Sequence, residues 1–163
     1  MKKTMKKLLL ELLKDSKRSD RELAKVLDVS QATVSRMRSK LVRDGLIREF
    51  TVIPDFSKLG YELMAISSVK TKIKPELEEK AKKLMKNYPN VIFVARAEGM
   101  GKNGVMISLH KDYTDYSSFI AEHLVHWGDD LENYDTLLIS LKGTIVRPFS
   151  LRYLAEVEET SED

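Results

Sequence analysis

The stretch Asp20–Ser39, DRELAKVLDVSQATVSRMRS, decides the fold of the first part of this 163-residue chain. Two short helices joined by a tight turn need a small residue where they cross, and Ala24 stands at that position. Val29 follows the turn as an apolar plug, while Val34 and Met37 are spaced to anchor the second of the two helices. The stretch therefore predicts a helix-turn-helix.

Signals at the ends of these helices agree with this prediction. Ser19 and Glu22 form a capping box that opens the first helix, and Ser30 is a suitable N-cap for the second. Gly45 can adopt the left-handed conformation that ends a helix. Asp28 stands in the turn where many such motifs have glycine, and aspartate tolerates a left-handed backbone better than most residues.

The sequence on either side completes a winged helix-turn-helix domain over residues 1–53. After Gly45, apolar and polar residues alternate over Leu46–Ile53, which predicts a strand that leaves the helices as a wing. Residues 54–61 then form a linker. Before the motif, an apolar stripe with helical spacing predicts a further helix, and its members are Met5, Leu8, Leu9, Leu12 and Leu13.

The helix that follows Ser30 is expected to bind DNA with the face opposite Val34, Met37 and Leu41. That face is small and polar at its start and basic at its end. Short side chains let a backbone approach base edges, an arginine can bind guanine with two hydrogen bonds, and later cations can hold phosphates. Each residue taken alone could equally be a solvated surface group. The predicted DNA-binding residues are Gln31, Ala32, Thr33, Ser35, Arg36, Ser39, Lys40 and Arg43.

Charge is distributed unevenly along the chain. Residues 1–50 contain 14 Lys and Arg against 7 Asp and Glu, a net charge of +7, whereas residues 51–163 contain 14 against 18, a net charge of −4. A polyanion-binding module joined to a second domain has this pattern, although a solvated lysine-rich helix does too. There is no cysteine, which excludes disulfides and thiolate metal sites. Without an apolar run of membrane length or a signal-peptide pattern, we expect a cytoplasmic protein with no membrane partner.

Residues 62–146 predict a second domain with the order βαββαβ, so the fold class is α+β with a ferredoxin-like unit after the helix-turn-helix. Such a unit packs two helices on one face of an antiparallel sheet, and the open face favours a homodimer. The expected elements are a strand over 62–71, a helix opened by Pro75, strands over 91–97 and 105–110, a helix capped by Asp112, and a strand over 136–141.

Residues 147–163 predict a C-terminal extension with an acidic tail. Four large apolar residues at its start are expected to cap a dimer or to pack on the sheet, and Glu156–Asp163 is expected to be disordered. The four apolar residues are Phe149, Leu151, Tyr153 and Leu154.

Residues 4–146 resemble the Lrp/AsnC (feast/famine) family of prokaryotic transcription regulators. The resemblance rests on Leu23-Ala24, Leu27 and Val29-Ser30, on Thr33–Met37 with Leu41, on Asp44–Arg48, and on the linker PDFSKLGY at 54–61. It implies a regulator that binds DNA as a dimer, or as a tetramer or octamer built of dimers, and responds to a small molecule that is often an amino acid.

The resemblance also implies an effector site near the loop that joins the second and third strands of the second domain. Family members usually have glycine followed by acidic residues there, whereas this chain has Met100, Lys102 and Asn103. An acidic effector or none is then possible, and a flexible hairpin is the plainer interpretation. The candidate effector residues are Gly99, Met100, Gly101, Lys102 and Asn103.

Alternatives remain open at this point. Some proteins that resemble the family decarboxylate sirohaem-type tetrapyrroles, and Arg96, His110 and His123 could bind propionates or move protons in such an enzyme. An architectural DNA-binding protein would share every feature and differ in sequence selectivity. His123 and His126 have a spacing that can bind a metal, but no third ligand is near in sequence. We therefore expect no catalytic residue, no cofactor and no metal.

Overall fold

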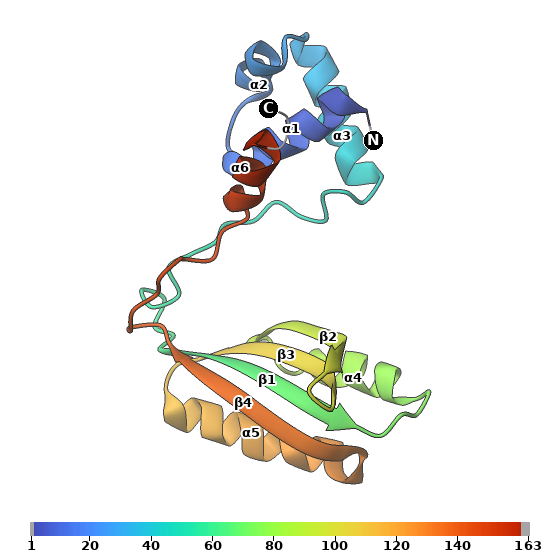
Figure 1. Cartoon of the computed structure of the whole chain (residues 1–163), viewed down its shortest axis with the longest axis vertical. Coiled ribbons are helices and arrows are strands. Elements are labelled where there is room, and N and C mark those ends of the chain that lie inside the picture. The colour runs from blue at the N-terminus through green and yellow to red at the C-terminus, as the bar shows by residue number, and fades with distance from the viewer. Residues whose placement is uncertain (1, 161–163) are drawn as a thin grey trace. The chain divides into compact units, whose positions relative to one another are not determined.

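The computed structural model describes residues 2–160, which form two compact units. The first unit comprises residues 2–53 together with 147–160, and the second is Pro54–Val146. The chain passes from the first unit into the second and returns to the first before its end (Figure 1). None of the described helices is long and apolar enough to cross a membrane.

The first unit is built from helices α1 (Lys3–Lys14), α2 (Asp20–Leu27) and α3 (Gln31–Arg43). Their apolar stripes meet in one core, as the helical spacing in the sequence predicts. Leu8, Leu23, Val34 and Leu41 are fully buried there. The remaining buried members of this core are Met5, Leu12 and Ala24.

The predicted ends of these helices are confirmed. The Ser19 hydroxyl accepts the backbone N–H of Glu22, and the Glu22 carboxylate accepts the backbone N–H of Ser19 at 2.7 Å. Asp28 has φ 51° and ψ 52°, the left-handed conformation that the turn needs. After α3, Gly45 at φ 72° directs its own N–H to the Val42 carbonyl, which ends the helix.

The strand predicted over Leu46–Ile53 is not formed. No backbone hydrogen bond joins residues 48–53 to any other segment that the structure describes, and a strand cannot exist without a partner strand. The apolar side chains of the alternating pattern are therefore exposed, with Phe50 at 51% and Val52 at 72%. The helix-turn-helix is present, while the wing that the sequence pattern suggested is an irregular segment in the single chain.

The C-terminal segment also differs from the expectation. Residues Arg152–Thr160 form helix α6, which packs on α1 in the first unit and buries Ala155 completely. It therefore neither packs on the sheet nor forms a disordered tail up to residue 160, and residues 161–163 of the expected tail lie outside the described residues. The Tyr153 ring lies against the guanidinium of Arg147, whose carbon is 3.6 Å from the ring centroid.

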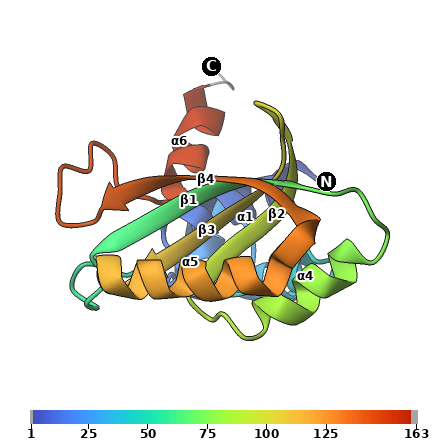
Figure 2. The same cartoon turned by 90° about the horizontal axis from the view of Figure 1, so that it is seen from below.

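The second unit has the predicted βαββαβ order. The elements are β1 (Leu63–Thr71), α4 (Leu77–Met85), β2 (Val91–Gly99), β3 (Lys102–His110), α5 (Tyr113–Trp127), a short 3-10 helix (Gly128–Asp130) and β4 (Leu131–Ser140). The antiparallel sheet has the strand order β2-β3-β1-β4, and α4 and α5 cover the same face (Figure 2).

Several boundaries of this unit differ from the prediction, and three of them lie at the starts of elements. Helix α4 begins at Leu77 rather than at Pro75, because the residues before it form a turn in which the Leu77 N–H reaches the Lys74 carbonyl. Strand β3 begins three residues early at Lys102, and β4 begins five residues early at Leu131. These added residues are polar at many positions, so apolar alternation does not reveal them.

The two faces of the sheet differ. Met106, Ser108 and His110 on β3 are buried beneath the helices, where Met106 packs with Tyr88 and Phe119. Residues directly opposite on neighbouring antiparallel strands share a face. The register therefore places the alternate residues, such as Ile66 opposite Ile107 and Leu137, on the face that the helices leave open.

Candidate functional site

The exposed face of α3 carries the residues predicted to bind DNA. Ser30 caps the helix, because its hydroxyl accepts the backbone N–H of Thr33 at 3.1 Å. The Thr33 hydroxyl lies 2.8 Å from the Ser30 hydroxyl, and the Thr33 side chain is half-buried. Arg36 is exposed and forms no hydrogen bond or ion pair with the residues that the structure describes. The other exposed members of this face before its basic end are Gln31, Ala32 and Ser35 near the start of α3 and Ser39 in its second half.

The basic end of the same face is already engaged by an acid. Lys40 Nζ lies 2.7 Å from one carboxylate oxygen of Asp44, and Arg43 Nε lies 3.2 Å from the other. Hydrogen bonds from Lys40 and then Arg43 lower the pKa of Asp44, so this carboxylate is charged at neutral pH. The two predicted phosphate-binding cations are thus held together at the end of α3, with part of their charge offset by Asp44.

Arg38 has a different role that the sequence did not reveal. Its guanidinium contacts the Asp20 carboxylate at 2.8 Å and donates to the Arg18 carbonyl at 3.1 Å. It therefore ties α3 to the start of α2 and lies over the ring of Phe50. The contacting residues are 18 and 20 positions away in sequence, so no local pattern marks this arginine as structural.

The candidate effector residues form a tight hairpin rather than the six-residue loop expected over 99–104. Gly99 pairs with Lys102, and the two residues between them, Met100 and Gly101, have φ values of 52° and 71°. Two positive φ angles in a row are the geometry of a two-residue hairpin turn. Met100 is 99% exposed at the tip.

The polar side chains of this hairpin already have partners. Lys102 forms an ion pair with Asp135 of β4, and its side chain is only 12% exposed. The Asn103 amide accepts the Thr71 N–H at 2.9 Å and donates to the Thr71 carbonyl at 2.7 Å, which extends the contact between β1 and β3. An effector at the hairpin would therefore have to compete with Asp135 for Lys102.

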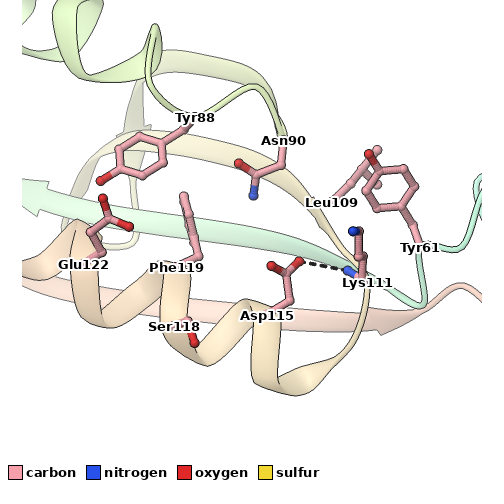
Figure 3. A pocket seen from close by; sticks show the side chains of 9 residues that line it. All are labelled: Tyr61, Tyr88, Asn90, Leu109, Lys111, Asp115, Ser118, Phe119 and Glu122. Atoms are coloured by element: carbon pink, nitrogen blue, oxygen red, sulfur yellow. Dashed lines mark hydrogen bonds between the residues drawn. The ribbon is translucent and has the colours of Figure 1, made fainter.

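A pocket of about 300 Å³ lies between the Tyr88–Asn90 segment and the first half of α5 (Figure 3). Phe119 and Tyr88 form its apolar side, and Asp115 accepts the backbone N–H of Lys111 at 2.9 Å. Sequence reasoning missed this pocket because its residues come from separate segments. The lining also includes Tyr61, Leu109, Ser118 and Glu122.

The fold brings together only two of the three residues that the decarboxylase alternative would use. Arg96 and His123 line one large cavity beneath α4, whereas His110 lies apart from it, on the other side of the Phe119 ring. Burial lowers the pKa of His110, and it lowers the pKa of His123 to about 4, with a smaller contribution from His126. Both imidazoles are therefore neutral at pH 7.

His123 and His126 lie in different surroundings. His123 is buried among aromatic rings, while His126 Nδ1 lies 2.9 Å from the Tyr88 hydroxyl. Within residues 2–160, no group of three or more His, Cys, Asp and Glu side chains is placed to hold a metal ion.

Comparison with known proteins agrees with both units. A family model described as "Winged helix-turn-helix DNA-binding" matches residues 1–48. The uncharacterized HTH-type transcriptional regulator PH0061 of Pyrococcus horikoshii is 33% identical over 132 residues, which cover 79% of this chain and 85% of that protein. The crystal structure of PH0061 superposes with a TM-score of 0.79 at 30% identity, covering 92% of this chain and 97% of that one.

More distant structures have the same fold. An AsnC family transcriptional regulator from Agrobacterium tumefaciens superposes with a TM-score of 0.76 at 19% identity, over 94% of this chain and 99% of that one. The regulator NMB0573 of Neisseria meningitidis, crystallised as a complex with L-Met, gives a TM-score of 0.76 at 17% identity with the same coverage. At these identities the likeness concerns the fold.

Proposed function

The chain belongs to the HTH-type transcriptional regulators that share the Lrp/AsnC fold, and on this premise we propose that α3 reads base sequence in the major groove of double-stranded DNA. The observation that carries the proposal is the exposed face of α3. Arg36 stands there without a partner among the described residues, less than two turns after the N-cap Ser30, among side chains small enough to let the helix approach the bases.

The face divides into a reading part and an anchoring part. Arg36 is proposed to bind guanine with both arms of its guanidinium, and Lys40 and Arg43 to bind phosphates, because they lie toward the end of the helix. To do so, these two cations exchange Asp44 for the DNA backbone. The reading part further includes Gln31, Ala32, Thr33 and Ser35, and Ser39 lies between the two parts.

We further propose that the protein acts as a homodimer joined through the open face of the sheet. Leu137 is 69% exposed and Phe93 is 51% exposed on this face, with Ile66 and Ile107 half-buried between them. An apolar sheet face of this kind is stable when a second copy covers it. Two copies would place two α3 helices on one DNA duplex, and tetramers or octamers would be assembled from such dimers.

The hairpin Gly99–Asn103 is proposed as the element that responds to an effector. Lys102 is bound to Asp135, so a small acid that replaces Asp135 would give the hairpin two states. The structural neighbour from Neisseria meningitidis was crystallised with L-Met, which makes an amino acid the natural first test. Lys102 favours one with an acidic side chain.

We propose a regulatory role in the cytoplasm and no catalytic activity. The enzyme alternative has little support, because the two histidines it needs are buried, neutral and separated by Phe119.

Genome-wide footprinting of bound DNA, followed by titration of the recovered site against random competitor DNA, tests the proposal. We expect the recovered site to bind at least about 1,000-fold more tightly than random DNA, as specific regulators do. A ratio near one would instead identify an architectural protein.

A further inference from the structure

A large cavity lies under helix α4 in the second unit. Its volume is about 1170 Å³, slightly above the range of small-molecule sites in proteins. Helix α4 does not seal it, since Leu77 is the only residue of that helix that is buried. The space is therefore open to solvent and large enough to admit a small molecule.

The walls of the cavity are mostly apolar. They come from the inner side of α4, from the strands below it, and from Trp127 at the end of α5. An apolar body of several carbon atoms would gain the free energy of leaving water there. The apolar wall residues include Leu77, Ala81, Met85, Val94, Met106 and Leu131.

The residue His123 of α5 also lines this space. His123 is 3% exposed, and its Nδ1 has no hydrogen-bond partner among the residues that the structure describes. A buried polar atom without a partner is rare in folded proteins because it loses its bond to water. Because this atom is inaccessible to a water-sized molecule, it does not by itself mark a ligand-binding position.

The charges around the cavity favour an anion. Six Lys and Arg line it against two acids, Glu78 and Glu79, and both of those acids bind Lys82. Lys72, Lys83, Lys86 and Arg96 form no ion pair with any residue in the described part of the chain, although Arg96 lies near enough for its charge to lower the pKa of Glu78.

We propose that this cavity binds an amphipathic organic acid, with its apolar body under α4 and its carboxylate among the unpaired cations beside Arg96. The residues that line this site all belong to one chain, and they include Asn103 of the hairpin Gly99–Asn103 but not Lys102, on which the effector proposal rests. The proposal is also independent of DNA recognition by α3, so either can fail without the other.

The full-length protein can be tested with decanoate, at submillimolar concentration, as a probe acid. Trp127 is the only tryptophan of the chain and lines the cavity, so its fluorescence reports occupancy directly. We expect a saturable change with decanoate and a weaker one with 1-decanol, which has the same apolar body without the charge. Acetate, which lacks the apolar body, should give no change.

Two variants locate the acid. Ala81→Glu places a like charge in the cavity wall and should weaken decanoate binding by at least about tenfold, while Ala121→Glu, at an exposed position of α5, should leave it unchanged. Arg96→Gln should weaken binding by about tenfold through loss of one charge-assisted contact, with Lys7→Gln in the other unit as its control.

Several results would overturn the proposal. Among them are no Trp127 response to decanoate, equal affinity for decanoate and 1-decanol, and unchanged affinity in Ala81→Glu. Light scattering of Ala81→Glu provides a further check. If this variant has a lower assembly mass than the parent, a second copy of the chain fills the space instead of an acid.

Discussion

At the end of α3, Asp44 holds Lys40 with 2.7 Å between carboxylate oxygen and ammonium nitrogen, on the face proposed to bind DNA. The acid is shared, because Arg43 contacts its other oxygen. Both cations are therefore kept close to the helix in the absence of DNA, at the cost of part of their attraction for phosphates. On the proposed role of this face, Asp44 would limit the affinity for non-specific DNA, and it has no ion pair with the proposed reading residues in the described part of the chain.

Replacing this acid should strengthen DNA binding. In Asp44→Asn, Lys40 and Arg43 lose their competitor, so affinity should rise for specific and random DNA alike, and the log–log salt slope should steepen by up to about 0.9 for each phosphate gained. Fluorescence anisotropy over a salt series measures both quantities. Weaker binding by the variant would mean that Asp44 instead orients the two cations.

Arg36→Ala should lower the ratio of specific to random DNA binding, since a bidentate contact with guanine discriminates by about 1–3 kcal/mol. Lys40→Ala should weaken both kinds of binding about equally and reduce the salt slope by about 0.9. Titrations against the footprinted site and random DNA separate the two roles. If the ratio of specific to random DNA binding is unchanged in Arg36→Ala, the bases are read by Gln31, Ala32 and Ser35 instead.

Arg38 should matter for stability rather than for DNA sequence. Its guanidinium joins Asp20 and the Arg18 carbonyl with both side chains about one-quarter exposed, so Arg38→Ala should destabilise the protein by about 1–2 kcal/mol. Urea denaturation of Arg38→Ala, Asp20→Asn and the double variant gives the coupling between them. Additive losses would show that the two side chains do not stabilise each other.

Acid should destabilise the second unit through His123. The pKa of His123 is about 4 in the folded chain, whereas its ordinary value is 6.5. Between pH 6.5 and 4, His123 is therefore protonated in the unfolded chain and neutral in the folded chain. The contribution of neutral His123 to the free energy of unfolding is fully present above pH 6.5, and it falls by about 3 kcal/mol as the pH drops to 4. Burial lowers the pKa of His110 too, which adds a loss of the same sign.

Urea midpoints measured between pH 4 and 7 test this dependence. His123→Phe keeps an aromatic ring in the same surroundings but cannot titrate, so its stability should change less over this range. A parent and variant with parallel pH profiles would assign the acid sensitivity to other groups.

Placing a charge on the open sheet face should separate the subunits. Leu137→Glu introduces a carboxylate where the second copy is proposed to pack, so light scattering should return the 18.7 kDa of one chain instead of a multiple of it. Val125→Glu, at a 79% exposed apolar position of α5, is the matched control and should leave the mass unchanged. A parent of 18.7 kDa at micromolar concentration would already contradict the dimer.

The helix-turn-helix could be predicted almost completely, because its determinants are local. The cap at Ser19, the left-handed Asp28 and the stop at Gly45 each act within a few residues of their own position. The βαββαβ order followed in the same way from alternating strands and amphipathic helices. The extent of β3 and β4 did not, because polar residues such as Asn103 join the sheet through partners distant in sequence.

Features that depend on distant partners were predicted poorly or missed. The Leu46–Ile53 pattern predicts a strand, but a strand requires a neighbour that its own sequence cannot supply. The apolar residues after Arg147 were expected to pack on the sheet or to cap a dimer; α6 packs on α1 and not on the sheet, and the capping of a dimer stays a prediction. The pairing of Lys40 and Arg43 with Asp44 is local, yet the sequence shows only that these charges are near, and not that they meet.

The return of α6 to α1 gives the chain an unusual order of parts. The βαββαβ unit interrupts the DNA-binding unit between Ile53 and Arg147, so it is an insertion within that unit. A single cut by a protease in either connection would leave two fragments, each of which carries part of the helical unit. A gene fragment that stops after β4 would encode α1 without α6, the helix that packs on it. An isolated DNA-binding unit that keeps α6 would instead be made by joining residue 53 to residue 147 through a short linker.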